Sequence, residues 1–293
     1  SFGVGTQETG PNDVFFKSDG SKMYVVGTGT DTIYQYSTAP VPTNAGDCGG
    51  NSGVTFPAAK TVYWNLSGTR NWDADGWATT SGGTPDAANF PLAQDTAVFD
   101  EAGSASIVVM KTFNIGTVDM GARTTSLQLQ GAGLTIYGNW TFGTGVSTGS
   151  SAGITFAGQG TTTITSNGVE FGLPVTFDCG TGTVQLADAI QLPDTRLLLQ
   201  SSGTFDAVSY NVTIGLFSST SNAGTGKIKS LKMGSGLWTM SGTGTVWGLD
   251  QSTFSTGVFD KGTADILLSS TSTAARTFNA LSVSSYNKLT IGG

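Results

Sequence analysis

The sequence contains no histidine, only 2 cysteines and only 8 prolines, and charged residues make up 11% of its 293 residues. An average soluble domain has roughly 25% charged residues, so this chain is polar without being charged. The absence of histidine excludes Ser-His and Cys-His nucleophile pairs, imidazole metal ligands and a histidine pH switch. Most familiar hydrolase mechanisms are therefore excluded by composition.

Charge and hydropathy exclude two classes of partner. The net charge of −7 comes from 13 basic and 20 acidic residues, and no run of Lys or Arg is long enough to follow a phosphate backbone. No stretch approaches the roughly 18 consecutive apolar residues of a membrane span. We therefore expect neither nucleic-acid binding nor membrane insertion. The start at Ser1, without an initiator Met or a signal segment, predicts either a processed chain or a fragment. The end at Gly292-Gly293 has no polar cap, which predicts that the natural chain continues beyond it.

The few residues that could carry chemistry fit structural roles better. Four aspartates recur within 30 residues, beside Gly, Pro or strand ends, where Asp commonly serves as a turn residue: Asp178, Asp188, Asp194 and Asp206. We predict no catalytic residue, although a glycan-degrading carboxylate pair among these four stays an alternative. The loop that opens at Asp73 has Thr84 where a calcium loop needs a bidentate Glu, so no metal and no cofactor is expected.

Two cysteines far apart in the chain define no disulfide framework. Cys48 and Cys179 either bond to each other or are two idle thiols, and the sequence favours the second alternative.

Strand patterns dominate what is present. The chain has 43 glycines, and its short apolar runs alternate with Ser, Thr or Gln and end at Gly, Asn or Asp. This period-2 pattern with turn residues predicts β-strands, and no amphipathic helical stretch is found. The fold class is therefore predicted to be all-β.

Residues 1–38 are predicted to form a separate β-repeat. Asp19-Gly20 lies between two β-rich runs, a strong hairpin signal, and a third short strand is expected at 32–36. This pattern resembles one repeat of the β-propeller families, which implies a propeller-like β-hairpin repeat. Residues 39–57 are rich in Pro, Gly and Asn and are predicted to be a linker.

Residues 58–104 are predicted to be a Trp-rich β cap. Trp64, Trp72 and Trp77 precede Gly-Gly-Thr-Pro at 82–85 and Asp-Thr-Ala-Val-Phe-Asp at 95–100. The order of these motifs resembles the entry segment of secreted or virion β-helical proteins. A stacked solenoid needs such a cap because its first turn otherwise exposes unpaired backbone groups and the end of the apolar core.

Residues 105–293 are predicted to form a parallel β-helix, also called a β-solenoid. The segment 204–215 aligns with 277–292, and a further copy of its opening begins at Lys111. Repeats separated by insertions of variable length suit a parallel β-helix, whose turns of roughly 20 residues keep their strands while the loops vary. A β-sandwich gives no reason for such repeats.

Two further tryptophans are candidates for binding sugars. Trp238 and Trp247 lie outside the predicted cap, and a flat indole face suits the ring of a pyranose. Burial in the core is the alternative for both.

Together the propeller-type repeat, the Trp-rich cap and the histidine-free solenoid resemble bacteriophage tail fibres and other virion appendages. The resemblance implies a structural virion protein used in host-cell attachment, a homo-oligomer that is expected to be a trimer, contacts with other virion proteins, and a host surface glycan or receptor as partner. The alternatives are an autotransporter-like adhesin passenger on the bacterial surface and a polysaccharide-degrading tailspike.

Overall fold

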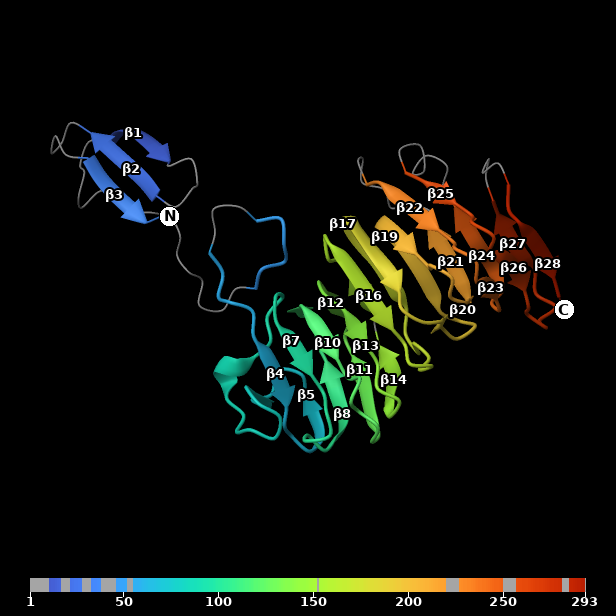
Figure 1. The fold of residues 1–293 in the computed structure, drawn as a ribbon, viewed down its shortest axis with the longest axis horizontal. Helices are drawn as coiled ribbons and strands as arrows, with labels where there is room; N and C mark the ends of the chain where they lie inside the picture. Colours follow the sequence, from blue (N-terminus) through green and yellow to red (C-terminus); the bar gives the residue numbers. More distant parts are fainter. Residues whose placement is uncertain are drawn as a thin grey trace. The chain divides into compact units, whose positions relative to one another are not determined.

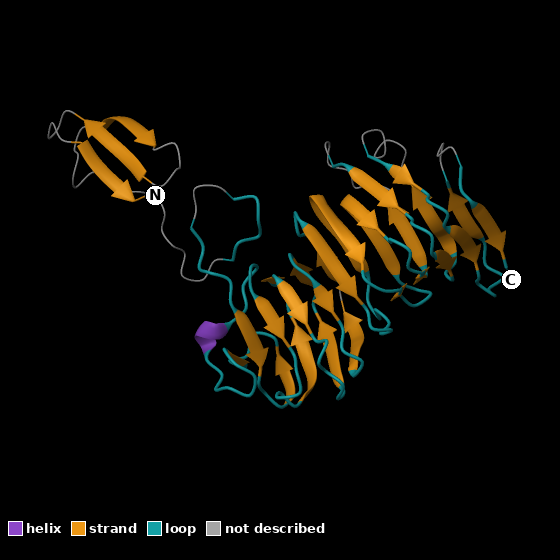
Figure 2. Cartoon of the chain, in the orientation of Figure 1, coloured by secondary structure: helices purple, strands orange, loops and turns teal. Residues whose placement is uncertain are grey.

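The structure is a computed structural model and describes residues 11–16, 22–27, 33–37, 46–51, 55–151, 153–219, 227–249, 257–280 and 285–292. The chain divides into two compact units, Ser1–Ala58 and Ala59–Gly293. Apart from a single 3-10 turn, η1 (Ala87–Asn89), all regular elements of the described residues are strands (Figure 2). The predicted all-β fold is confirmed.

The first unit contains one antiparallel sheet. Its strands are β1 (Pro11–Phe16), β2 (Lys22–Gly27) and β3 (Ile33–Ser37), with β2 in the centre. Val14 pairs with Val25, and Val26 pairs with Ile33. The predicted turn at Asp19-Gly20 lies outside the described residues. The sheet does not identify a propeller blade, so the propeller-like assignment stays a prediction.

The second unit is a parallel β-solenoid of about 8 turns over residues 96–291, which confirms the predicted β-helix (Figure 1). Each full turn contributes strands to three faces. Face 1 contains β4 (Thr61–Trp64), β7 (Thr96–Val98), β10 (Thr117–Asp119), β13 (Trp140–Thr141), β16 (Thr161–Thr165), the second halves of β17 (Val175–Leu186) and β19 (Leu197–Asp206), β22 (Lys229–Lys232) and β25 (Phe259–Asp260).

Face 2 contains β5 (Gly68–Asn71), β8 (Ala105–Met110), β11 (Leu127–Gly131), β14 (Val146–Ser151), β18 (Ile190–Gln191), β20 (Val212–Ile214), β23 (Leu237–Met240), β26 (Asp265–Leu268) and β28 (Lys288–Ile291). Face 3 contains β9 (Asn114–Ile115), β12 (Leu134–Ile136), β15 (Ile154–Phe156), the first halves of β17 and β19, β21 (Leu216–Ser219), β24 (Gly244–Leu249) and β27 (Arg276–Asn279). Because β17 and β19 continue round a corner, faces 1 and 3 join into one 16-stranded sheet.

Successive turns are held together by backbone hydrogen bonds along the solenoid axis. Val118 pairs with Trp140, and Trp140 pairs with Ile164, so these turns take 22 and 24 residues. The amide of Val118 donates to the carbonyl oxygen of Asn139 at 2.9 Å. On faces 1 and 3 each turn thus satisfies the strand edge of the turn before it, whereas the strands of face 2 form two separate sheets, one from β5 to β14 and one from β18 to β28.

Alternating side chains form a continuous apolar interior. In β17 the buried positions alternate with partly exposed ones on both sides of the corner. Inward-facing aromatic rings contact one another from turn to turn at tilted angles, with centroids 5.9 Å apart between Phe156 and Phe177 and 4.8 Å apart between Phe177 and Phe205. Burial of these large rings supplies much of the apolar driving force for folding.

The first turn is covered by its own strand and a cluster of tryptophans. β6 (Trp77–Ala78) pairs antiparallel with β4, while the other edge of β4 pairs parallel with β7. Trp64, Trp72, Trp77 and Phe99 are buried, and the rings of Trp77 and Phe99 lie within 5.7 Å of each other and of the rings of Trp64 and Trp72, centroid to centroid. Side chains and backbone together therefore close this end of the core.

The structure corrects the predicted phase of the internal repeat. Thr204 and Thr277, which the sequence alignment treats as equivalent, lie on face 1 and face 3, since Thr204 pairs with Ser230 and Thr277 with Thr245. All three faces alternate outward polar and inward apolar residues, so similar short strands fit any of them. The ends of the two repeats, in β20 and β28, do belong to one sheet.

Candidate functional site

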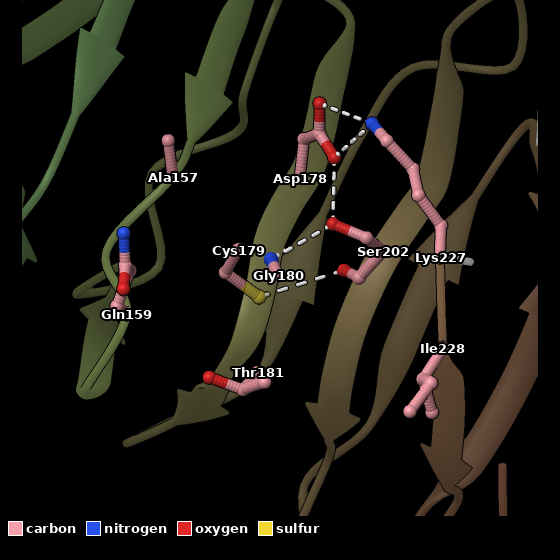
Figure 3. Close-up of a pocket in the computed structure, with 9 residues that line it drawn as sticks. All are labelled: Ala157, Gln159, Asp178, Cys179, Gly180, Thr181, Ser202, Lys227 and Ile228. Atoms are coloured by element: carbon pink, nitrogen blue, oxygen red, sulfur yellow. Dashed lines mark hydrogen bonds and ion pairs between the residues drawn. The ribbon is translucent and has the colours of Figure 1, made fainter. Parts of the chain in front are cut away.

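A surface groove lies at the corner between faces 3 and 1. Its volume is about 420 Å³, within the range of about 300–1,000 Å³ that is usual for small-molecule sites. Figure 3 shows residues from consecutive turns around it. The groove is lined by Ala157, Gln159, Asp178, Cys179, Gly180, Thr181, Ser202, Lys227 and Ile228.

Two glycines shape this corner. Gly180 in β17 has φ +59° and Gly203 in β19 has φ +82°, which is the left-handed region that side chains with a Cβ disfavour. The thiol of Cys179 occupies the space beside Gly203 where a Cβ would lie. Gly203 is therefore required both by its backbone conformation and by the close approach of Cys179.

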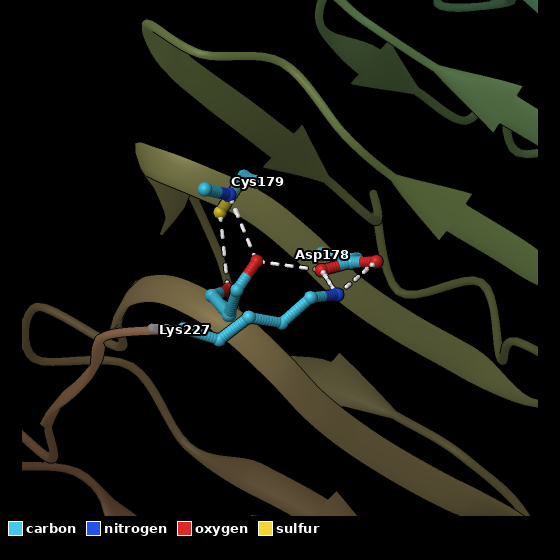
Figure 4. Close-up of polar contacts among 5 residues, drawn as sticks. Asp178, Cys179 and Lys227 are labelled. Carbon is cyan, nitrogen blue, oxygen red and sulfur yellow. Dashed lines mark hydrogen bonds and ion pairs between the residues drawn. The ribbon is translucent and has the colours of Figure 1, made fainter. Parts of the chain in front are cut away.

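A polar network crosses the groove and joins three turns. The Nζ of Lys227 lies 2.7 Å from Oδ1 and 2.9 Å from Oδ2 of Asp178 (Figure 4). The hydroxyl of Ser202 donates to Oδ1 of Asp178 at 2.6 Å and accepts from the amide of Gly180 at 2.8 Å (Figure 3). The ion pair is partly exposed, with 39% of the Lys227 side chain and 37% of the Asp178 side chain accessible to solvent.

The network keeps Asp178 ionised. Burial alone would raise the pKa of this carboxyl, but hydrogen bonds from Lys227 and Ser202, together with the charges of Lys227 and Lys229, lower the pKa below its ordinary value. Lys229 is buried and donates to the carbonyl oxygen of Ser219 at 3.0 Å. A carboxylate with a lowered pKa is a weak base, so Asp178 is poorly suited to activate the hydroxyl of Ser202.

Cys179 also lacks the properties of a nucleophile. Burial raises the pKa of its thiol to about 11, and its Sγ lies 3.4 Å from the carbonyl oxygen of Gly182. The thiolate is the reactive form, so this cysteine stays protonated and unreactive at neutral pH. Neither Cys179 nor Cys48 takes part in a disulfide.

The four aspartates singled out in the sequence have separate contacts. Asp188 accepts from the amides of Ser166 and Asn167, Asp206 accepts from the amide of Val208, and Asp194 is exposed in a turn. Asp178 is the one carboxylate among the described residues that line the groove. Glycoside hydrolysis by two carboxylates therefore gains no support from this site.

The prediction that Trp238 and Trp247 stack on sugars is wrong. Both side chains are 0% exposed, because both point into the interior of the solenoid. Trp247 stacks on Phe278 with an interplanar angle of 7° and donates to the hydroxyl of Tyr286 at 2.9 Å, while Trp238 donates to the carbonyl oxygen of Met233 at 3.1 Å. The burial alternative is the correct one for both.

Two residues of the groove have no individual signal in the sequence. Nothing in the sequence around Ser202 or Lys227 distinguishes it from the other Ser and Lys residues. Their contact with Asp178 becomes visible only when the register of β17, β19 and the next solenoid turn is known. Their separations from Asp178, 24 and 49 residues, are close to one and two turns of the solenoid. That spacing could have indicated the network once the length of each turn was known.

The described residues contain no group of three or more side chains suited to hold a metal ion. Within the same part of the chain, no helix has the length and hydropathy needed to cross a membrane. Comparison of the chain with protein-family models, curated proteins and solved structures gives no match.

Proposed function

We propose that the chain is part of a bacteriophage structural protein, a tail fibre or other surface appendage, and that the solenoid forms a rod used in host-cell attachment. The observation that carries this proposal is the unbroken parallel pairing on faces 1 and 3 from β4 to β27. Backbone hydrogen bonds and a shared core along the axis suit a stiff spacer. The fold is equally compatible with an adhesin or a tailspike. The preference for a virion appendage therefore rests on the low charge of the chain and on the order of the motifs in the Trp-rich cap.

The proposed role is structural and binding rather than catalytic. The proposed partners are other copies of the chain in a symmetric trimer, other virion proteins, and a glycan or receptor on the host surface. The proposed location is the virion.

Immunogold electron microscopy tests this proposal. Antibodies raised against the 293-residue chain are applied to phage particles and to uninfected host cells. Label along an appendage of the particles is the expected result. Label on the surface of uninfected cells, with none on particles, overturns the proposal in favour of a bacterial adhesin.

A further inference from the structure

We propose that the groove at Asp178 and Lys227 binds a neutral saccharide unit. That the groove binds the host-surface glycan rests on the proposed function, but saccharide binding itself can be measured independently. The charge, the hydrogen-bonding groups and the apolar surface of the groove all suit such a ligand.

Charge selects a neutral ligand. Of the described residues that line the groove, Asp178 and Lys227 carry the ionised groups, and their ion pair leaves the lining without net charge. A charged ligand would gain attraction from one partner and be repelled by the other. A neutral ligand meets a formed ion pair that needs no rearrangement before binding.

The unused hydrogen-bonding capacity suits hydroxyl groups. A lysine ammonium has three donors, of which two contact Asp178, so Lys227 keeps one donor. An ionised carboxylate has about four acceptor positions, of which Asp178 uses three for Lys227 and Ser202, so one acceptor position remains. Gln159 and Thr181 are exposed and add an amide and a hydroxyl, which both donate and accept. Donors and acceptors close together on one surface match the neighbouring hydroxyls of a sugar ring, each of which also donates and accepts.

The groove also offers apolar contact. Ile228 is 46% exposed, and the methyl group of Ala157 lines the opposite side of the groove (Figure 3). These groups can contact the C–H surface of a sugar ring while its hydroxyls face Asp178 and Lys227. The described lining contains no aromatic ring, so affinity at one groove is expected to be weak and to increase when several copies bind one glycan.

Saturation-transfer difference NMR on the full chain tests the proposal. The probes are the methyl glycosides of glucose, galactose, mannose, rhamnose and N-acetylglucosamine, with N-acetylneuraminic acid and inorganic phosphate as charged competitors. The expected result is saturation transfer to at least one neutral glycoside, with no displacement by either charged competitor.

Amino-acid substitutions test whether the saccharide binds in this groove. The double substitution Gln159→Ala with Thr181→Val removes exposed groups of the groove without breaking the ion pair, and about a tenfold loss of affinity is expected, equivalent to about 1.4 kcal/mol. Gln191→Ala changes an exposed glutamine of β18 on face 2 and is expected to leave binding unchanged. Circular dichroism confirms that each variant is folded.

Three outcomes overturn the inference: no transfer to any neutral glycoside, displacement of the glycoside by a charged competitor, or equal transfer to the double variant and the unmodified chain. If binding fails while immunogold label lies on particles, this inference fails and the proposed function stands. If a neutral glycoside binds in the groove while the label lies on uninfected cells, the proposed function fails and the saccharide site stands.

Discussion

Glu101 and Arg123 lie on adjacent turns of the solenoid, and the side chain of each hydrogen-bonds to residues of the other's turn. The guanidinium of Arg123 donates to the carbonyl oxygens of Asp100, Gly103 and Ala105, next to Glu101. The carboxylate of Glu101 in turn accepts from the amides and hydroxyls of two residues beside Arg123, Thr124 and Thr125. Arg123 thus satisfies carbonyl oxygens near Glu101, and Glu101 satisfies amide and hydroxyl donors next to Arg123.

Replacing Arg123 by Met is expected to lower the free energy of unfolding by about 3 kcal/mol, because several buried carbonyl oxygens lose a charged donor. Urea unfolding measures this change. Arg70→Met is the matched control, since Arg70 is exposed and donates to the carbonyl oxygen of Thr69, its neighbour in the chain. A loss no larger for Arg123→Met than for Arg70→Met would contradict the role of Arg123.

Glu101 predicts a pH-dependent contribution to stability. Hydrogen bonds from the Thr125 hydroxyl and then from the Thr124 amide and hydroxyl lower the pKa of Glu101 from 4.5 to about 2. Because the folded pKa is the lower one, its stabilising effect is complete above pH 4.5 and disappears as the pH falls towards 2. The difference in unfolding free energy between the unmodified chain and Glu101→Gln should therefore shrink over this range. A difference that is constant with pH would show that the carboxylate charge is unimportant.

Alanine at Gly203 should be more destabilising than alanine at Gly244. Both glycines have positive φ, at +82° and +76°, but a Cβ at Gly203 collides with the thiol of Cys179, whereas a Cβ at Gly244 meets nothing within 4 Å. We expect about 1 kcal/mol for Gly244→Ala from the backbone alone and about 3 kcal/mol for Gly203→Ala. Thermal or urea unfolding compares the two, and equal losses would rule out the close packing of Cys179 against Gly203.

Tryptophan fluorescence tests the burial of all six indole rings. Trp64, Trp72, Trp77, Trp140, Trp238 and Trp247 are each at most 1% exposed. Acrylamide should therefore quench the folded protein weakly and the urea-unfolded protein strongly. A readily quenched fraction in the folded state, lost on Trp238→Phe or Trp247→Phe, would reinstate these rings as exposed candidates for sugar stacking.

The sequence predicts the solenoid because alternation along short strands is a local property. In Leu127–Gly131, for example, buried leucines alternate with partly exposed glutamines, and turn residues mark where such runs end. Which face a run occupies depends instead on the lengths of all the corners before it. The predicted equivalence of Thr204 and Thr277 fails for this reason.

The groove could not be predicted from the sequence because its members meet through register. The sequence predicts a turn role for Asp178, which instead lies within β17, and its contacts with Ser202 and Lys227 depend on solenoid turns of 24 and 25 residues that stack at one corner. The exposure of Trp238 and Trp247 could not be predicted from the sequence either, since a one-residue shift in register decides whether an indole on a strand points inward or outward.

Cryo-electron microscopy of the native assembly tests whether this chain is part of a phage appendage. We predict a symmetric appendage on a phage particle, whose density contains copies of the three-faced solenoid with the tryptophan-covered first turn at one end. Density that places single solenoids on a bacterial outer membrane, without a phage particle, would contradict this prediction.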